Sequence, residues 1–208
     1  MDEPLPRPRS PLAELFLSAQ SAPPDDAAAV FVQSLSFVGQ VAVRGKPDDR
    51  QFLGAVREIA GIDLPPVAGA VAEAEHCRAI WLGPDHWLFI TAEGAAQEMT
   101  AKLQHAFAGL FAAAIDVSGA RMRLRLIGPA ALDVLASGCR LDLGSEGFGA
   151  GHAVQTQVGN VTAIIHCLPA EPAGEGLGYD LYVPRSQALS FWRWLEHAGR
   201  PFRLSIRA

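Results

Sequence analysis

The sequence predicts an α+β protein made of two fused ferredoxin-like halves, each with the element order β-α-β-β-α-β. Short strand patterns alternate with amphipathic helix patterns along most of the chain. Their order is that of the split βαβ unit, and the second half repeats motifs of the first. The chain has 208 residues, which is long enough to bury a core without a disulfide or a structural metal.

Residues 1–30 are predicted to form a separate, proline-rich N-terminal arm, because prolines interrupt any long helix there. A short helix over residues 11–19 is expected, with Ser10 as its N-cap. Its apolar side chains share one face. They are Leu12, Leu15 and Phe16. Three alternatives stay open: the arm lies on its own domain, lies on another chain, or is disordered.

Residues 31–118 are predicted to form the first half. Its first helix opens at Lys46-Pro47-Asp48 and ends at Gly61. A turn at residues 83–86, with sequence Gly-Pro-Asp-His, joins two strands. The predicted elements are strand 38–43, helix 46–60, strands 78–82 and 87–91, helix 95–110 and strand 114–117.

Residues 119–208 are predicted to form the second half. Gly128-Pro129 starts its first helix, and a Gly159-Asn160 turn joins two of its strands. A further strand and a long helix follow the glycine-rich stretch 169–178. The predicted elements are strand 122–127, helix 128–136, strands 153–157, 161–167 and 179–183, helix 184–197 and strand 202–206.

Aligning the two halves indicates an internal duplication. Gly45 and Pro47 correspond to Gly128 and Pro129, and Ile62-Asp63-Leu64 corresponds to Leu141-Asp142-Leu143. Two such layers would bury their sheet faces together as one core, so residues 31–208 are expected to form one compact domain. The short junction at residues 116–121 argues against free hinge motion.

The cysteines and their histidine neighbours do not predict a metal site. Cys139 lies apart from the adjacent pairs His76-Cys77 and His166-Cys167, and no CxxC is present. The side chains of adjacent residues on a strand point to opposite faces, so neither pair can readily coordinate one metal ion. We therefore expect three free cysteines, buried and inert.

The aspartates and glycine-rich loops do not predict catalysis either. Asp63 and Asp142 hold equivalent places in the two halves, which indicates a structural role, and Asp116-Val117-Ser118 is expected to order the junction. Asp180 is a further strand carboxylate. The stretch 144–151 lacks the GxGxxG order and the P-loop lysine. The chain is thus predicted to hold no catalytic, cofactor-binding or metal-binding residue.

Charge and composition restrict the partners and the location. The net charge is −5 and no basic stripe occurs, which disfavours nucleic acid. No apolar run suits a signal peptide or a membrane span, so we expect a cytoplasmic protein.

Charged residues make up 19% of the chain, below the usual ~25%, which favours a surface covered by a partner. Trp192 and Trp194 point about 200° apart on one helix, so one is expected in the core and the other near the surface. Two alternatives stay open for the outer one: an exposed interface anchor or a half-buried surface side chain.

Several motifs, in order, resemble the gamma subunit of heterotetrameric sarcosine oxidase. The stretch 81–88, WLGPDHWL, is similar to the family's LGPDEW signature, and Asp116-Val117-Ser118 with Arg121 resembles its DVSHRR segment. Residues 126–143 and the run 179–186, YDLYVPRS, continue the match. The resemblance covers nearly the whole chain. His86 departs from it, because the family has an acid there.

This resemblance implies a fold related to the glycine-cleavage T-protein and a non-catalytic subunit of a four-chain enzyme. Its partners would be the alpha, beta and delta subunits, which would hold FAD, FMN, NAD, tetrahydrofolate and zinc. The complex would oxidise sarcosine to glycine, produce hydrogen peroxide and pass the methyl carbon to tetrahydrofolate. The chain lacks the K-G-C-Y-x-G-Q-E segment of one folate-binding branch. Residues 138–142, with sequence GCRLD, occupy the corresponding region. Folate binding is therefore not transferred to this chain.

Three alternatives remain open from the sequence. One is the equivalent subunit of another N-methyl amino-acid oxidase or dehydrogenase. Another is a stand-alone folate-binding or aminomethyltransferase-like module, which the fold permits but does not imply. The last is a scaffold protein unrelated to one-carbon metabolism.

Overall fold

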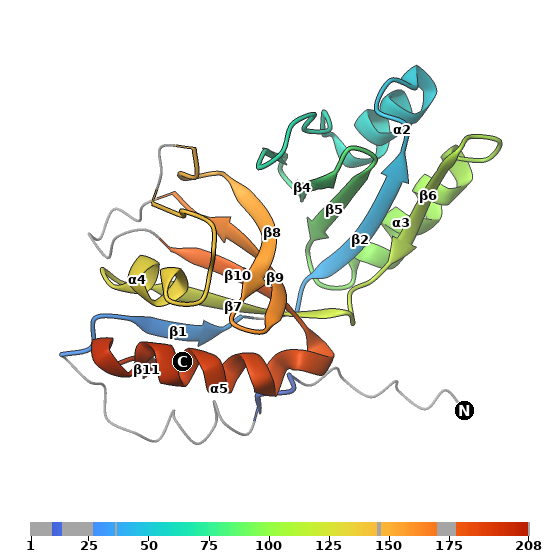
Figure 1. Cartoon of the computed structure of the whole chain (residues 1–208). Coiled ribbons are helices and arrows are strands. Elements are labelled where there is room, and N and C mark those ends of the chain that lie inside the picture. Colours follow the sequence, from blue (N-terminus) through green and yellow to red (C-terminus); the bar gives the residue numbers. More distant parts are fainter. Residues whose placement is uncertain (1–9, 14–26, 36, 145–146, 170–177, 208) are drawn as a thin grey trace, which may run out of the picture.

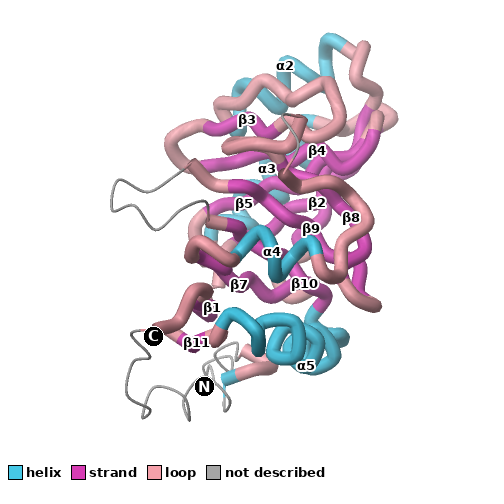
Figure 2. The backbone as a smooth tube through the Cα atoms, turned by 60° about the vertical axis from the view of Figure 1, so that its left-hand side comes forward, coloured by secondary structure: helices cyan, strands magenta, loops and turns pink. Residues whose placement is uncertain are grey.

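The computed structural model describes residues 10–13, 27–35, 37–144, 147–169 and 178–207. Two sheets face each other across an apolar layer, and helices cover their outer faces (Figure 1). Turned by 60°, the chain shows α2 at one end and α5 at the other (Figure 2). The predicted α+β class is confirmed. No helix within the described ranges is long and apolar enough to cross a membrane.

The first sheet has five strands in the order β3-β4-β5-β2-β6. Helices α2 (Arg50–Ala60) and α3 (Ala95–Ala106) supply buried residues to the core on its outer face, including Phe52 and Leu103. Its strands are β2 (Gly39–Gly45), β3 (Val71–Glu73), β4 (Cys77–Gly83), β5 (His86–Thr91) and β6 (Ala112–Asp116).

Helix α2 begins later than predicted. Asp49 is the N-cap, because its carboxylate accepts from the backbone N–H groups of Gln51 and Phe52. The start expected at Lys46 is therefore wrong. Gly61 ends the helix with φ 66°, as predicted, in a conformation that glycine adopts without strain.

Helix α3 ends earlier than predicted. Its last residue is Ala106, whereas the pattern extended it to Leu110. Phe107 still donates to the carbonyl of Leu103, but Gly109 takes φ 82° and turns the chain away. The strand that follows therefore starts at Ala112, two residues before the predicted start.

The second sheet has six strands in the order β11-β1-β7-β10-β9-β8. Helices α4 (Ala131–Ala136) and α5 (Ala188–Gly199) pack on its outer face, and a 3-10 turn (Arg185–Gln187) precedes α5. The strands are β1 (Phe31–Ser34), β7 (Arg121–Ile127), β8 (Ala153–Val158), β9 (Val161–Cys167), β10 (Tyr179–Pro184) and β11 (Ser205–Ile206).

The N-terminal part of the chain contributes to this second sheet. Residues 31–34, which the predicted division groups with residues up to 118, form β1 and pair with β7. Leu12 is buried in the core of the same sheet, so at this point the arm lies on its own chain. Ser10 accepts from the Leu12 N–H, as expected of an N-cap. The rest of the predicted helix, residues 14–19, lies outside the described residues.

The inner faces of the two sheets meet in an apolar layer. Tyr182 and Ile164 from the six-stranded sheet pack with Ile80 and Leu88 from the five-stranded sheet, and all four are buried. The sheets are also joined by backbone, since Ala153 donates to the carbonyl of Gly69. Strands β3, β4, β7, β9 and β10 surround one polar cluster beside this layer.

Candidate functional site

Strand β7 carries three arginines on its inner face. Met122, Leu124 and Leu126 are buried in the outer core with α4 and α5. Because side chains alternate along a strand, the intervening residues face the other sheet. They are Arg121, Arg123 and Arg125.

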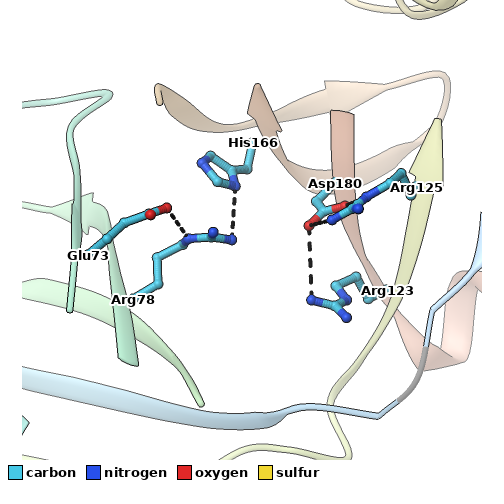
Figure 3. Close-up of polar contacts among 6 residues, drawn as sticks. All are labelled: Glu73, Arg78, Arg123, Arg125, His166 and Asp180. Carbon is cyan, nitrogen blue, oxygen red and sulfur yellow. Dashed lines mark hydrogen bonds and ion pairs between the residues drawn. The ribbon is translucent and has the colours of Figure 1, made fainter. Parts of the chain in front are cut away.

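Strand register brings a buried carboxylate against these arginines. Asp180 on β10 lies opposite Arg125 on β7, and its side chain is 0% exposed. Arg125 Nε and Nη2 donate to the two carboxylate oxygens at 2.7 and 3.1 Å (Figure 3). Arg123 Nη1 lies 4.0 Å from Asp180 Oδ2. Such a bidentate pair offsets part of the cost of burying the charges.

The five-stranded sheet adds a second ion pair to this cluster. Arg78 on β4 donates to Glu73 Oε1 at 2.6 Å, and its Nη1 lies 3.4 Å from Nδ1 of His166 on β9 (Figure 3). A guanidinium can only donate, so Nδ1 must accept and the proton of the neutral ring sits on Nε2. We call these six residues the intersheet cluster, namely Glu73, Arg78, Arg123, Arg125, His166 and Asp180.

His166 is held neutral within this cluster. Burial, together with the nearby Arg78 guanidinium, lowers the pKa of His166 to about 4. Asp180 and Glu73 act in the opposite direction, and Arg125 adds to the lowering. Protonation at Nδ1 would also remove the acceptor that Arg78 uses.

Acid is therefore expected to destabilise the fold through His166. Between pH 6.5 and pH 4 the unfolded chain binds a proton that the native chain does not, so the free energy of unfolding falls by about 3 kcal/mol as pH drops across this window. His166→Gln keeps an acceptor for Arg78 and removes the titration. Urea unfolding at a series of pH values should show a smaller pH slope for this variant. His76→Gln, at a solvent-exposed histidine, is the control; equal slopes in all three proteins would contradict the expectation.

The sequence interpretation did not single out these arginines. The signal was available: RMRLRLI alternates arginine with large apolar residues in a strand of a two-sheet protein. That alternation indicates an inner face that is polar rather than apolar. Asp180 was noted as a strand carboxylate, but its partner Arg125 lies 55 residues away.

The thiols lie where the sequence predicts inert cysteines. Cys77 and Cys167 are buried and Cys139 is partly buried, and all three are free. Burial raises the pKa of Cys77 to about 12, which disfavours the reactive thiolate. Burial also raises the pKa of Cys167. Within the described part of the chain, no group of three or more His, Cys, Asp or Glu side chains could hold a metal ion.

The aspartate motifs have structural partners. Asp116 Oδ1 accepts from the backbone N–H and the hydroxyl of Ser118, and the Ser118 hydroxyl accepts from the Gln40 N–H at 3.0 Å. This order at the junction was predicted. Asp63 pairs with Arg57, and Asp142 accepts from the Gly144 N–H. In the stretch 144–151, residues 145 and 146 lie outside the described residues, and the remainder connects to β8.

The two tryptophans of α5 follow the expectation that one lies in the core and the other near the surface, and the outer one is half-buried rather than an exposed anchor. Trp192 is buried, and Trp194 packs partly buried against the same core, in the space left by two glycines, Gly138 and Gly159. Trp87 is buried and donates to the carbonyl of Pro65 at 2.9 Å. Among the residues that the structure describes, Phe111 is an aromatic side chain that is 83% exposed.

Phe111 leads into β6, an edge strand of the five-stranded sheet. This strand reads AAAID and pairs with β2 on one side only, within the described residues. Ile115 is 58% exposed on it. A concave region of about 340 Å³ adjoins Phe111 and Ala113, and Lys46 Nζ lies 5.8 Å from the Phe111 ring centroid. We call Phe111 and strand β6 the β6 edge.

Comparison with known proteins identifies the family. The sarcosine oxidase, gamma subunit family matches residues 44–200. Sarcosine oxidase subunit gamma from Corynebacterium sp. (strain P-1) is 36% identical over 140 residues, which is 67% of this chain and 68% of the relative. The subunit from Corynebacterium sp. (strain U-96) is 32% identical over 158 residues, which is 76% of each chain.

Solved structures agree with this match. A chain of the heterotetrameric sarcosine oxidase from Corynebacterium sp. U-96, in complex with pyrrole 2-carboxylate, is 28% identical with a TM-score of 0.80. The similarity covers 97% of this chain and 99% of that chain. The glycine cleavage system aminomethyltransferase T from Bartonella henselae shares the fold, at 18% identity and a TM-score of 0.62, over 94% of this chain and 58% of that chain. The chain therefore belongs to the sarcosine oxidase gamma subunit family.

Proposed function

We propose that this chain is the non-catalytic gamma subunit of a heterotetrameric sarcosine oxidase. The observation that carries the proposal is its similarity, over 97% of its length, to a whole chain of such an enzyme. The intersheet cluster supports a subunit without a reaction centre of its own. Its carboxylate Asp180 is engaged by Arg125, and its imidazole His166 by Arg78.

The partners and cofactors of the complex follow from the same proposal. Alpha, beta and delta subunits would surround this chain and hold FAD, FMN, NAD, tetrahydrofolate and zinc, none of which this chain would bind. The complex would convert sarcosine to glycine and hydrogen peroxide and transfer the methyl carbon to tetrahydrofolate. We place this assembly in the cytoplasm.

We assign the contact with a partner subunit to the β6 edge. Unpaired edge strands invite pairing with other chains, and natural proteins usually protect them with charge, proline or a cover. Residues 112–115 carry neither a charge nor a proline, and Phe111 and Ile115 are exposed beside them. Coverage by another subunit would bury these side chains and pair the free backbone edge.

We also infer that the chain consists of an arm (1–30) and two halves (31–118 and 119–208) that arose by duplication. The order β3-β4-β5-β2-β6 parallels β8-β9-β10-β7-β1, and each half carries two helices on its outer face. The halves differ beside β7, where β1 from residues 31–34 occupies the place that β6 takes beside β2, with β11 beyond it. Pairing of β1 with β7 would join the start of the first half to the sheet of the second half.

Co-purification tests the proposed function. The chain, tagged and expressed in its native cells, is expected to elute in stoichiometric amounts with three other subunits and with flavin absorbance. The purified complex should form hydrogen peroxide from sarcosine faster than from other N-methyl amino acids. Preference for another N-methyl amino acid would favour the related oxidase or dehydrogenase. Elution as a lone monomer without flavin would contradict the proposal.

A further inference from the structure

The intersheet cluster carries more positive than negative charge. Asp180 and Glu73 are its carboxylates, and both are already engaged, by Arg125 and Arg78 respectively. The arginines left over are on β7. Arg123 shares Asp180 only at 4.0 Å, and no carboxylate among the described residues lies within ion-pair distance of Arg121.

Burial makes this surplus charge costly. The Arg123 side chain is 19% exposed, and its Nε is buried without a hydrogen-bond partner among the described residues. On the same inner face, His166 Nε2 is a second buried donor with no partner there. Buried polar groups are rarely left unpaired, and buried cations even more rarely, because the hydration lost on burial is not replaced.

A cavity that is open to solvent lies beside the Arg123 side chain. It has a volume of about 220 Å³ and opens between the two sheets, with Arg78 of β4 and Arg123 of β7 in its lining. Thr91 adds a polar group, and Cys77, Val38 and Ile90 add apolar surface. Glu73 also lines it, but this carboxylate is held by Arg78 at 2.6 Å.

We propose that this cavity binds a small oxyanion, a carboxylate or a phosphate, held between the guanidinium groups of Arg123 and Arg78. Planar guanidinium groups donate in pairs to such oxyanions. The ligand would supply the counter-charge that Arg123 lacks, because Asp180 lies 4.0 Å from its Nη1 and is already bound by Arg125. The cavity fits a small molecule rather than a folded partner. The proposal does not depend on assembly with other subunits, so it is tested on the full chain alone.

Isothermal titration of the full chain with inorganic phosphate, and separately with succinate, tests the proposal at constant ionic strength in chloride. At least one probe should bind saturably at one site. Arg123→Gln should weaken that binding by about tenfold or more, since one charged hydrogen-bonded partner is lost. Arg193→Gln, at an exposed arginine on α5, is the matched control and should bind as the unchanged chain does.

The two probes distinguish the ligand class. Saturable binding of phosphate alone identifies a phosphate site, and binding of succinate alone identifies a carboxylate site. Arg123→Lys keeps the charge but not the paired donors, and should weaken binding severalfold even if Arg123→Gln does not fold. Failure of both probes to bind, or equal binding by the unchanged chain and Arg123→Lys, would overturn the proposal.

A stability measurement separates this role from a purely structural one. Without anion, Arg123→Gln removes a surplus, largely buried cation, so its urea midpoint should equal or exceed that of the unchanged chain. Addition of the bound probe should raise the midpoint of the unchanged chain only, because a ligand stabilises the state that binds it. A lower urea midpoint for Arg123→Gln without anion would show that Arg123 stabilises the fold through its ion pair with Asp180. That result would overturn the proposed oxyanion site.

Discussion

Asp180→Asn is expected to lower the free energy of unfolding by about 3 kcal/mol or more, as is typical when one partner of a buried ion pair is removed. The carboxylate is 0% exposed and accepts two hydrogen bonds from Arg125, at 2.7 and 3.1 Å. Asparagine is nearly isosteric but carries no charge and has only one acceptor oxygen. The Arg125 guanidinium, which is partly buried, would lose its counter-charge. Urea unfolding at neutral pH measures the effect.

A surface control variant and a double variant test whether the loss comes from the buried Asp180 carboxylate and its pairing with Arg125. Asp63→Asn removes an ion pair with Arg57 that is also hydrogen-bonded, at 2.7 Å, but lies on the surface, where solvent screens it. It should leave the urea midpoint unchanged. The double variant Asp180→Leu with Arg125→Met should recover much of the loss, because two apolar groups need no pairing. If Asp180→Asn is as stable as the unchanged chain, the ion pair between Asp180 and Arg125 does not stabilise the fold, and the prediction is wrong.

Phe111→Asp is expected to weaken binding to the partner subunit by about 30-fold, which corresponds to the ~2 kcal/mol that marks an interface hot spot. The side chain is 83% exposed, so it contributes little to the fold of the isolated chain. In the complex it would be buried, and an aspartate there would need to lose its hydration. Surface plasmon resonance between the full chain and the remaining subunits gives the ratio of dissociation constants.

A second edge variant and a control test the same surface. Ile115→Lys places a charge on β6, the residue type that natural edge strands use against pairing, and should weaken assembly in the same direction. Leu189→Lys changes a side chain that is 50% exposed on α5, a helix on the other sheet, and should leave assembly unchanged. Normal affinity of both β6 variants, with a loss for Leu189→Lys, would move the interface to α5.

Prediction of the secondary structure from the sequence succeeded where a local pattern was strong. The turn residues at 83–86 and 159–160 separate the predicted strand pairs, and Gly61 ends α2, because glycine and proline limit the backbone locally. The predicted start of α2 and end of α3 were wrong. Asp49 caps the first turn of α2, and Gly109 adopts a positive φ after α3, and apolar periodicity detects neither feature. The short strands β1 and β3 were not predicted, because they depend on distant partners.

The candidate site was harder to predict than the fold. Sequence motifs supported the family and the order at the junction, where Asp116 and Ser118 are two residues apart. The intersheet cluster joins residues far apart in the chain, such as Arg78 and His166, which are 88 residues apart. Helix geometry left open whether the outer tryptophan of α5 is exposed or half-buried, and the tertiary structure packs Trp194 partly buried and exposes Phe111.

The sequence by itself determined the α+β class, most of the elements and the family, because periodicity, turn residues and motif order are local properties of the chain. Only the tertiary structure decided which sheet receives residues 31–34, which side chains lie between the sheets and which strands form the sheet edges. Strand register and the packing of two faces set these features. They depend on the free energy of contacts between distant segments, which no local pattern encodes.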